Sequence, residues 1–218
     1  MKKLKEVREK YLNDEIKLEK WQSFAVFAMV YVTSGIIGWV YEFIFYFFNG
    51  GMKEFYLQGG NFLPWINIYA FGAFLILFLV KILKIKKKPL LVFLVSVVGT
   101  GVLEYVAGWL VFKLGNGARF WNYNTEILNF GNIDGFVCFR SVLAFGLSAL
   151  GLVYLLMPAI ILFAQKMSKK VFYLVVVIFL IFLIDEVYNS ILTRVVPGLP
   201  NAVGIYQSMG GKYVPGGT

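Results

Sequence analysis

The sequence contains no histidine and a single cysteine, Cys138. Without histidine, the chain has no His-based acid–base catalysis, no His metal ligand and no Ser-His-Asp triad. A single cysteine excludes an intrachain disulfide and any zinc site built on paired cysteines. The sequence also lacks the G-x-x-x-x-G-K-[ST] motif, so the chain is not itself a P-loop ATPase. We expect neither a cofactor nor a metal site, because nothing in the spacing of the acids specifies a divalent ion.

Charge is also scarce, at 15% of residues against about a quarter in an average soluble domain. Hydrophobic residues make up 59% of the chain, and the mean hydropathy is +0.73. Runs of about 20 apolar residues with few charges are typical of transmembrane helices. We therefore predict an all-α polytopic membrane protein with a bundle of five transmembrane helices. The predicted spans are residues 21–48, 61–84, 89–114, 141–165 and 171–196.

Two segments flank the predicted bundle of residues 21–196. Residues 1–20 carry apolar side chains at helical spacing between charges, which predicts an amphipathic cytoplasmic helix. This arm either lies on the anionic inner leaflet or docks a cytoplasmic partner. It has no signal-peptide pattern, so the first span would serve as its own insertion signal. Residues 197–218 are rich in proline and glycine, which predicts a flexible extracytoplasmic tail.

The net charge of +9 does not indicate nucleic-acid binding, because the basic residues lie in short blocks between apolar runs. Residues 1–20, 81–88 and 166–170 hold seven, five and three lysines or arginines, which is 15 of the 21 in the chain. Five spans place these three blocks on the same side. The positive-inside rule then puts the N-terminus in the cytoplasm and the C-terminus outside.

Four carboxylates lie late in the first, third and fifth predicted spans, which run in the same direction. They are Glu42, Glu104, Asp185 and Glu186. Sixteen residues separate Glu104 from the basic block below it, and sixteen separate Glu186 from its own block, a rise of about 24 Å in each case. A charge near the bilayer centre costs roughly 2.5–3.5 kcal/mol, so these acids must be paired, hydrated or protonated. Arg140 is the best-placed partner for Glu104 or Glu42.

Other polar residues open spans on the same side or lie one turn from an acid. We predict that all of them line one outward-facing cavity, although the acids can also be hydrated interface residues or fixed ion pairs. The predicted ligand-binding residues in the spans are Glu42, Asn67, Tyr69, Glu104, Arg140, Asp185, Glu186 and Asn189. Residues 115–139 would form a lid that supplies Trp121 and Tyr123. The alternative for these two aromatic residues is an interfacial belt.

Five blocks of sequence resemble the ABC-transporter type IV family (CmpB-like). They are Gly38-Trp39-x-x-Glu42, Pro64-x-x-x-Ile68-Tyr69, Leu103-Glu104-Tyr105-x-x-Gly108-Trp109, Trp121-x-Tyr123 and Asn132-x-x-Gly135-x-Val137-Cys138-x-x-Ser141. The resemblance implies a small bacterial integral membrane protein, a permease component of the cytoplasmic membrane, and places Cys138 at a motif position. Asn122 replaces the aspartate of the family's W-D-Y pattern. Asn67 and Ala70 replace a proline and a glycine.

Three functions are open to such a chain. The first is a transport or permease component that binds a small polar or cationic solute or a lipid headgroup, with a separate ATPase or other membrane subunit as partner. The second is a non-catalytic scaffold or regulatory subunit. The third is a membrane-embedded enzyme acting on a lipid headgroup through its carboxylates, which the lack of histidine and of a recognisable nucleophile disfavours.

Overall fold

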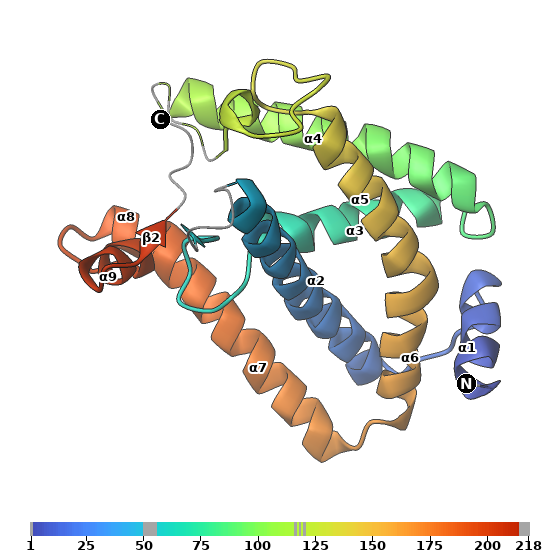
Figure 1. Cartoon of the computed structure of the whole chain (residues 1–218). Helices are drawn as coiled ribbons and strands as arrows, with labels where there is room; N and C mark the ends of the chain where they lie inside the picture. The colour runs from blue at the N-terminus through green and yellow to red at the C-terminus, as the bar shows by residue number, and fades with distance from the viewer. Residues whose placement is uncertain (1, 50–55, 116, 118, 120, 214–218) are drawn as a thin grey trace. The chain divides into compact units, whose positions relative to one another are not determined.

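The computed structural model describes residues 2–49, 56–115, 117, 119 and 121–213, and most of these are helical (Figure 1). Four helices are long and apolar enough to cross a membrane. They are α2 (Lys20–Asn49), α4 (Pro89–Leu114), the helix that joins α5 (Phe139–Gly151) to α6 (Met157–Lys166), and the helix from α7 (Lys169–Val187) to α8 (Thr193–Val195). The chain is therefore an all-helical protein of membrane-spanning character.

The second predicted span, residues 61–84, contains α3 (Asn67–Ile82). This helix is apolar but has only 16 residues, which is about 24 Å of α-helix and less than the ~30 Å hydrocarbon core. The prediction of five spans is thus supported for four of them. The segment before α3 is not helical, because Pro64 and the glycines at 59 and 60, both at positive φ, interrupt the pattern.

The described chain divides into two compact units. Unit 1 comprises residues 2–73 and 154–213, and unit 2 comprises residues 74–153, each with the gaps given above. The chain passes between the units within α3 and within a π-helical turn at Leu152–Leu156. That turn directly precedes Pro158, which has no N–H to donate in the helix.

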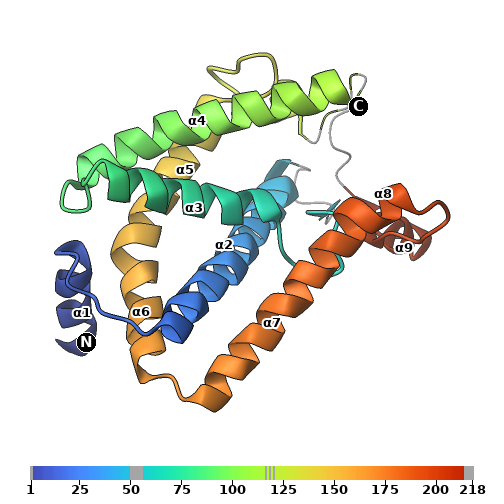
Figure 2. The same cartoon turned by 180° about the vertical axis from the view of Figure 1, so that it is seen from behind.

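In unit 1, α2 packs against both α6 and α7 (Figure 2). Phe179 of α7 lies edge-on to Tyr31, with ring centroids 5.2 Å apart, and Gln22 donates a hydrogen bond to the Ala164 carbonyl of α6. Helix α1 (Lys2–Leu12) lies within the predicted N-terminal arm, whose amphipathic and cytoplasmic character stays a prediction. Its Val7 and Tyr11 are buried, and α1 packs along α6. Part of the predicted apolar stripe is therefore covered by this chain itself.

The predicted flexible tail contains two short elements in its described part, which ends at residue 213. Helix α9 (Ala202–Ser208) begins at Asn201, whose side chain accepts the Gly204 N–H. Strand β2 (Lys212–Tyr213) pairs in parallel with β1 (Tyr56–Leu57). The flexibility of the tail and the proposed domain limits stay predictions, and residues 214–218 lie outside the described residues.

In unit 2, α4 and α5 pack closely against each other. Helix α4 begins at Pro89 as predicted, because a proline suits the first turn, where its missing N–H leaves no bond unmade. Gly146 of α5 faces α4, and a Cβ there would lie 2.6 Å from Val97 and 2.8 Å from Phe93. The absence of a side chain at Gly146 thus permits the close approach of the two helices.

Candidate functional site

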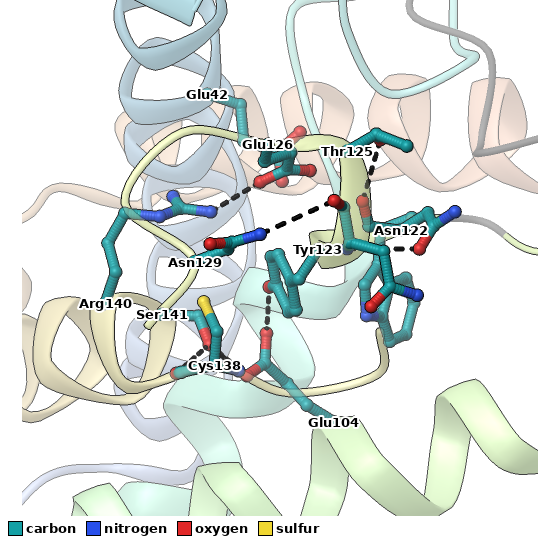
Figure 3. Close-up of polar contacts among 12 residues, drawn as sticks. Glu42, Glu104, Asn122, Tyr123, Thr125, Glu126, Asn129, Cys138, Arg140 and Ser141 are labelled. Atoms are coloured by element: carbon teal, nitrogen blue, oxygen red, sulfur yellow. Dashed lines mark hydrogen bonds and ion pairs between the residues drawn. The ribbon is translucent and has the colours of Figure 1, made fainter. Parts of the chain in front are cut away.

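Glu104 is buried inside α4, with 4% of its surface exposed. Its two carboxylate oxygens accept hydrogen bonds from the Tyr123 hydroxyl at 2.6 Å and the Ser141 hydroxyl at 2.7 Å (Figure 3). Both donors are neutral. Glu104 is therefore buried in the third predicted span, as the sequence predicted. Among the described residues, its hydrogen-bond donors are hydroxyl groups and not a basic side chain.

Tyr123 is held in place by the fold of the loop between α4 and α5. Its backbone N–H donates to the Gly135 carbonyl, and the Asn122 side chain accepts the Asn124 N–H to cap a short 3₁₀ turn at Tyr123–Thr125. Gly135 has φ +75°, and a Cβ there would lie 2.6 Å from the side chains of Asn122 and Asn124. Only glycine fits such a position without strain. An aspartate at position 122 would make the same cap.

Ser141 comes from the first turn of α5. Cys138 is the N-cap residue of that helix, and its backbone N–H donates to the Ser141 hydroxyl oxygen at 3.4 Å. The Ser141 hydroxyl lies within hydrogen-bonding distance of both Glu104 and the Cys138 carbonyl, but its single proton can serve only one of them at a time. Helix capping and carboxylate binding are thus coupled at this residue.

Arg140 forms an ion pair with Glu126, which is buried in the loop. The Arg140 guanidinium also lies 5.4 Å from the centroid of the Tyr123 ring, close enough for a cation–π contact. It attracts Glu104 through space but is not its hydrogen-bond donor in the described contacts. Sequence reasoning missed Glu126, because an acid in a polar loop has no apolar run around it to mark it as buried.

Trp121, the other aromatic residue predicted for the lid, donates its indole N–H to the Phe136 carbonyl at 2.8 Å. Across the same loop, the Arg119 guanidinium lies 4.4 Å from the Phe136 ring centroid. Trp121 thus ties together the loop that carries Tyr123. Residues 116, 118 and 120 of the predicted lid lie outside the described residues.

Burial raises the pKa of the Tyr123 hydroxyl well above its ordinary value, and the negative charge of Glu104 and the hydrogen bond to it raise it further. The phenol therefore keeps its proton at any physiological pH. It remains a hydrogen-bond donor to Glu104 under all conditions in which the protein would work.

Asp185 and Glu186 lie side by side in α7 in unit 1, and each accepts hydrogen bonds from different partners. Asp185 receives the backbone N–H groups of Phe62 and Leu63 at 3.1 and 2.7 Å. Glu186 receives the side-chain amides of Asn61 and Asn67 at 2.8 and 2.6 Å, and the Ser190 hydroxyl at 2.6 Å. Asp185 thus satisfies the backbone of the non-helical segment before α3.

Asn189 lies one turn after Asp185, in the π-helical turn at Tyr188–Leu192 that continues α7. Its side-chain amide donates to Asp185 at 2.8 Å, and its carbonyl oxygen accepts the Ala202 N–H at 2.8 Å. The residue therefore links the acid to the start of α9. The predicted proximity of Asn189 to Asp185 is observed, but its described partners are parts of this chain.

Glu42 accepts a hydrogen bond from the Tyr69 hydroxyl at 2.9 Å. The two residues meet because α2 has no side chain at Gly38, where a Cβ would lie 2.0 Å from the Tyr69 ring. Likewise, a Cβ on Gly35 would lie 1.9 Å from Trp65, whose indole donates to the Tyr31 carbonyl. The lack of side chains on this face of α2 thus permits the close approach of Tyr69 and Trp65.

The ten predicted ligand-binding residues divide between the two units. Unit 1 holds Glu42, Asn67, Tyr69, Asp185, Glu186 and Asn189, and unit 2 holds Glu104, Trp121, Tyr123 and Arg140. We call the group of Glu104, Tyr123, Ser141, Arg140 and Glu126 the Glu104 cluster. The single cavity and the binding of a ligand stay predictions. Within the described residues, no three acids or cysteines are arranged to hold a metal ion.

Comparison with protein families finds a match over residues 29–191. This range contains all five motif blocks, and the last three of these blocks supply Glu104, Trp121, Tyr123, Cys138 and Ser141, which the fold gathers in unit 2. Comparisons with curated proteins and with solved structures gave no match. Since the matched range covers most of the sequence, the chain belongs to the family described as "Putative ABC-transporter type IV".

Proposed function

We propose that this protein is a transport or permease component that binds a small cationic or polar solute, or a lipid headgroup, at the Glu104 cluster. The observation that carries the proposal is the environment of Glu104. A carboxylate buried in a membrane helix is costly, and its described hydrogen-bond donors are neutral hydroxyls. A buried carboxylate of this kind is stabilised when it binds a proton or a cation.

The hydroxyl donors also favour reversible binding. Ser141 can turn its proton from Glu104 to the Cys138 carbonyl, which frees one carboxylate oxygen without breaking the helix cap. Tyr123 offers the face of its ring and already lies near the Arg140 guanidinium. A cationic solute would gain from both the carboxylate and the aromatic ring.

Asp185 has a different function in this proposal. It stabilises the non-helical segment that leads into α3, whose backbone would otherwise lie unpaired in an apolar environment. That segment, together with α3, would make the second of the five crossings and return the lysines at 81–88 to the cytoplasmic side. Such a path keeps the N-terminus inside a bacterial cytoplasmic membrane and the C-terminus outside, in line with the positive-inside rule.

The topology can be tested with reporters. Alkaline phosphatase fused after Thr218 should be active, because that enzyme folds outside the cytoplasm, and the same enzyme fused after Lys87 should be inactive. Activity of the second fusion, or inactivity of the first, would contradict five crossings with the N-terminus inside.

The solute site can be tested in proteoliposomes that contain the full chain. We expect uptake or binding of radiolabelled methylammonium or choline, used as small cationic probes, to fall at least tenfold in Glu104→Gln. Ser148→Ala, a change in the same helix as Ser141 but away from the cluster, is the matched control. Equal uptake by wild type and Glu104→Gln would refute the assignment of the site.

If ATP drives transport, a separate protein must hydrolyse it, because this sequence has no P-loop motif. We therefore propose a separate ATPase or other membrane subunit as partner. Co-purification of a stoichiometric ATPase from native membranes would support this. Undiminished uptake by the isolated chain without ATP would argue against it.

A further inference from the structure

The buried face of α4 extends beyond Glu104 as a line of polar side chains. The buried residues of this helix recur every four positions and are Val92, Ser96, Thr100, Glu104 and Gly108. Residues four apart lie on the same face of an α-helix. Three consecutive members of this line carry oxygen atoms, and they extend from the Glu104 cluster toward Pro89, the end of α4 that follows the lysine block.

Ser96 is the unusual member of this line. It is 1% exposed, and its hydroxyl has no hydrogen-bond partner in the part of the chain that the structure describes. The Thr100 hydroxyl donates to the Ser96 carbonyl at 2.7 Å, so the threonine oxygen can still accept a proton from another donor. A buried hydroxyl without a partner costs free energy, and buried water commonly supplies that partner.

Close helix packing does not account for these hydroxyls. Small residues allow the approach of two membrane helices, and glycines at 101 and 146 already serve this purpose between α4 and α5. Alanine at position 96 would pack as closely and would leave no polar atom unsatisfied. A hydroxyl at this point is therefore better explained by water that it contacts than by packing.

We propose that the Ser96–Thr100–Glu104 face of α4 is a hydrated path along which water and protons reach Glu104 from the lysine end of the helix. The proposal rests on the function proposed for Glu104 and adds the route by which its carboxylate exchanges protons. Side chains four residues apart are about 5–6 Å from each other, so a water molecule must bridge each gap. A proton passed to a Glu104 oxygen gives the neutral acid, and the reverse step restores the carboxylate.

Val92 would be the gate of this path. It is the next residue on the face, it is fully buried and it is apolar. No other buried residue of α4 lies on this line between Ser96 and the lysine end of the helix. A path that opens and closes at Val92 suits a transporter, whose site should not be open to both sides at once.

Thiol accessibility tests the path without knowledge of the substrate. Cysteine is introduced in the full chain at positions 96 and 100, and the water-soluble reagent MTSET is applied to inside-out membrane vesicles. Val98→Cys and Val102→Cys are the matched controls. These apolar residues lie on another face of the same helix, where their exposed side chains would face lipid rather than water. Native Cys138, which is buried, gives the background rate.

We expect Ser96→Cys and Thr100→Cys to react at least tenfold faster than both controls. Adding Val92→Ala should raise the rate of Ser96→Cys a further threefold or more. Rates no higher than those of the controls, in variants whose melting temperature matches that of the native chain, would overturn the path. If Ser96→Cys fails to fold, Thr100→Cys decides the question by the same comparison.

Failure of the path and failure of the proposed function are distinguishable. Labelling at positions 96 and 100 without Glu104-dependent uptake of either cation would leave the hydrated path standing and refute the solute site. Glu104-dependent uptake without labelling would refute the path alone.

Discussion

Asp185 of unit 1 and Glu104 of unit 2 are both buried acids within long apolar helices, but their partners differ in kind. Asp185 accepts two backbone N–H groups from a segment that has no helical hydrogen bonds of its own. Glu104 accepts two side-chain hydroxyls, and one of them, Ser141, also lies within hydrogen-bonding distance of the Cys138 carbonyl. The first arrangement supports the fold, whereas the second can be rearranged by a ligand. An acid in a membrane helix therefore indicates a function only once its donors are known.

The largest effect should come from removing the acid that supports the backbone. Asp185→Ala would leave the Phe62 and Leu63 N–H groups buried without an acceptor. At about 1–3 kcal/mol for each orphaned group, we expect the free energy of unfolding to fall by about 2–6 kcal/mol. Thermal and denaturant unfolding in detergent would measure it.

Ile184→Ala is the control for this change, since its side chain is exposed and apolar. Asp185→Asn keeps one acceptor oxygen and should lose less stability than Asp185→Ala. A melting temperature of Asp185→Ala equal to that of the control would show that the two acids do not differ in the way we infer.

A smaller loss should follow Gly38→Ala, which tests how far the hydrogen bond between Tyr69 and Glu42 depends on close packing. The new Cβ would lie 2.0 Å from the Tyr69 ring, which must move and so weaken the bond from Tyr69 to Glu42. Overpacking of this kind costs about 1–3 kcal/mol. Gly151→Ala, where nothing lies within 4 Å of the added Cβ, should instead be neutral or stabilising by about 0.5–1 kcal/mol. Equal melting temperatures for the two variants would contradict the packing argument.

Glu104→Gln should separate binding from stability. The amide keeps the shape and one acceptor oxygen, so we expect the free energy of unfolding to change by about 1 kcal/mol or less. Binding of the cationic probes should nevertheless fall at least tenfold, because the charge is lost. Equilibrium binding and unfolding measured on the same sample test both halves. A large loss of stability with unchanged binding would place Glu104 with Asp185 as a structural acid.

The smallest effect concerns alkaline pH. The pKa of Tyr123 is raised in the folded protein, chiefly by burial and then by Glu104, whereas an unfolded tyrosine titrates near 10. The stabilising contribution of this raised pKa is therefore fully present below pH 10 and is lost as the pH rises toward the folded value. Tyr123→Phe should lose stability less steeply above pH 10 than wild type. Parallel curves for the two proteins would show that the phenol is not buried against a carboxylate.

Several features of the site followed from sequence patterns alone. The apolar runs and the lysine blocks predicted the membrane helices, and α4 begins at Pro89 as a proline at a helix start predicts. Glu104 was singled out because an acid within an apolar run is expensive, and it is buried. The family resemblance placed Trp121, Tyr123 and Cys138 among positions that the fold brings together with Glu104.

Other features needed coordinates. Arg140 forms an ion pair with Glu126, in a loop whose path depends on backbone bonds among Asn122, Gly135 and their neighbours. The expected pairing of Arg140 with Glu104 or Glu42 stays a prediction. The role of Asp185 could not be predicted, because two of its three described donors are backbone N–H groups more than 120 residues away. Residues 61–66 read as part of a span, whereas the helix begins at Asn67.

The sequence by itself determined that the chain is a helical membrane protein, because hydropathy and charge act locally and accumulate along each segment. It also determined which acids would be costly to bury. Only the tertiary structure decided what stabilises each acid, since hydrogen-bond donors come from distant loops and helices whose meeting depends on packing. For that reason Asp185 and Glu104 look alike in the sequence and differ in their chemistry once the chain is folded.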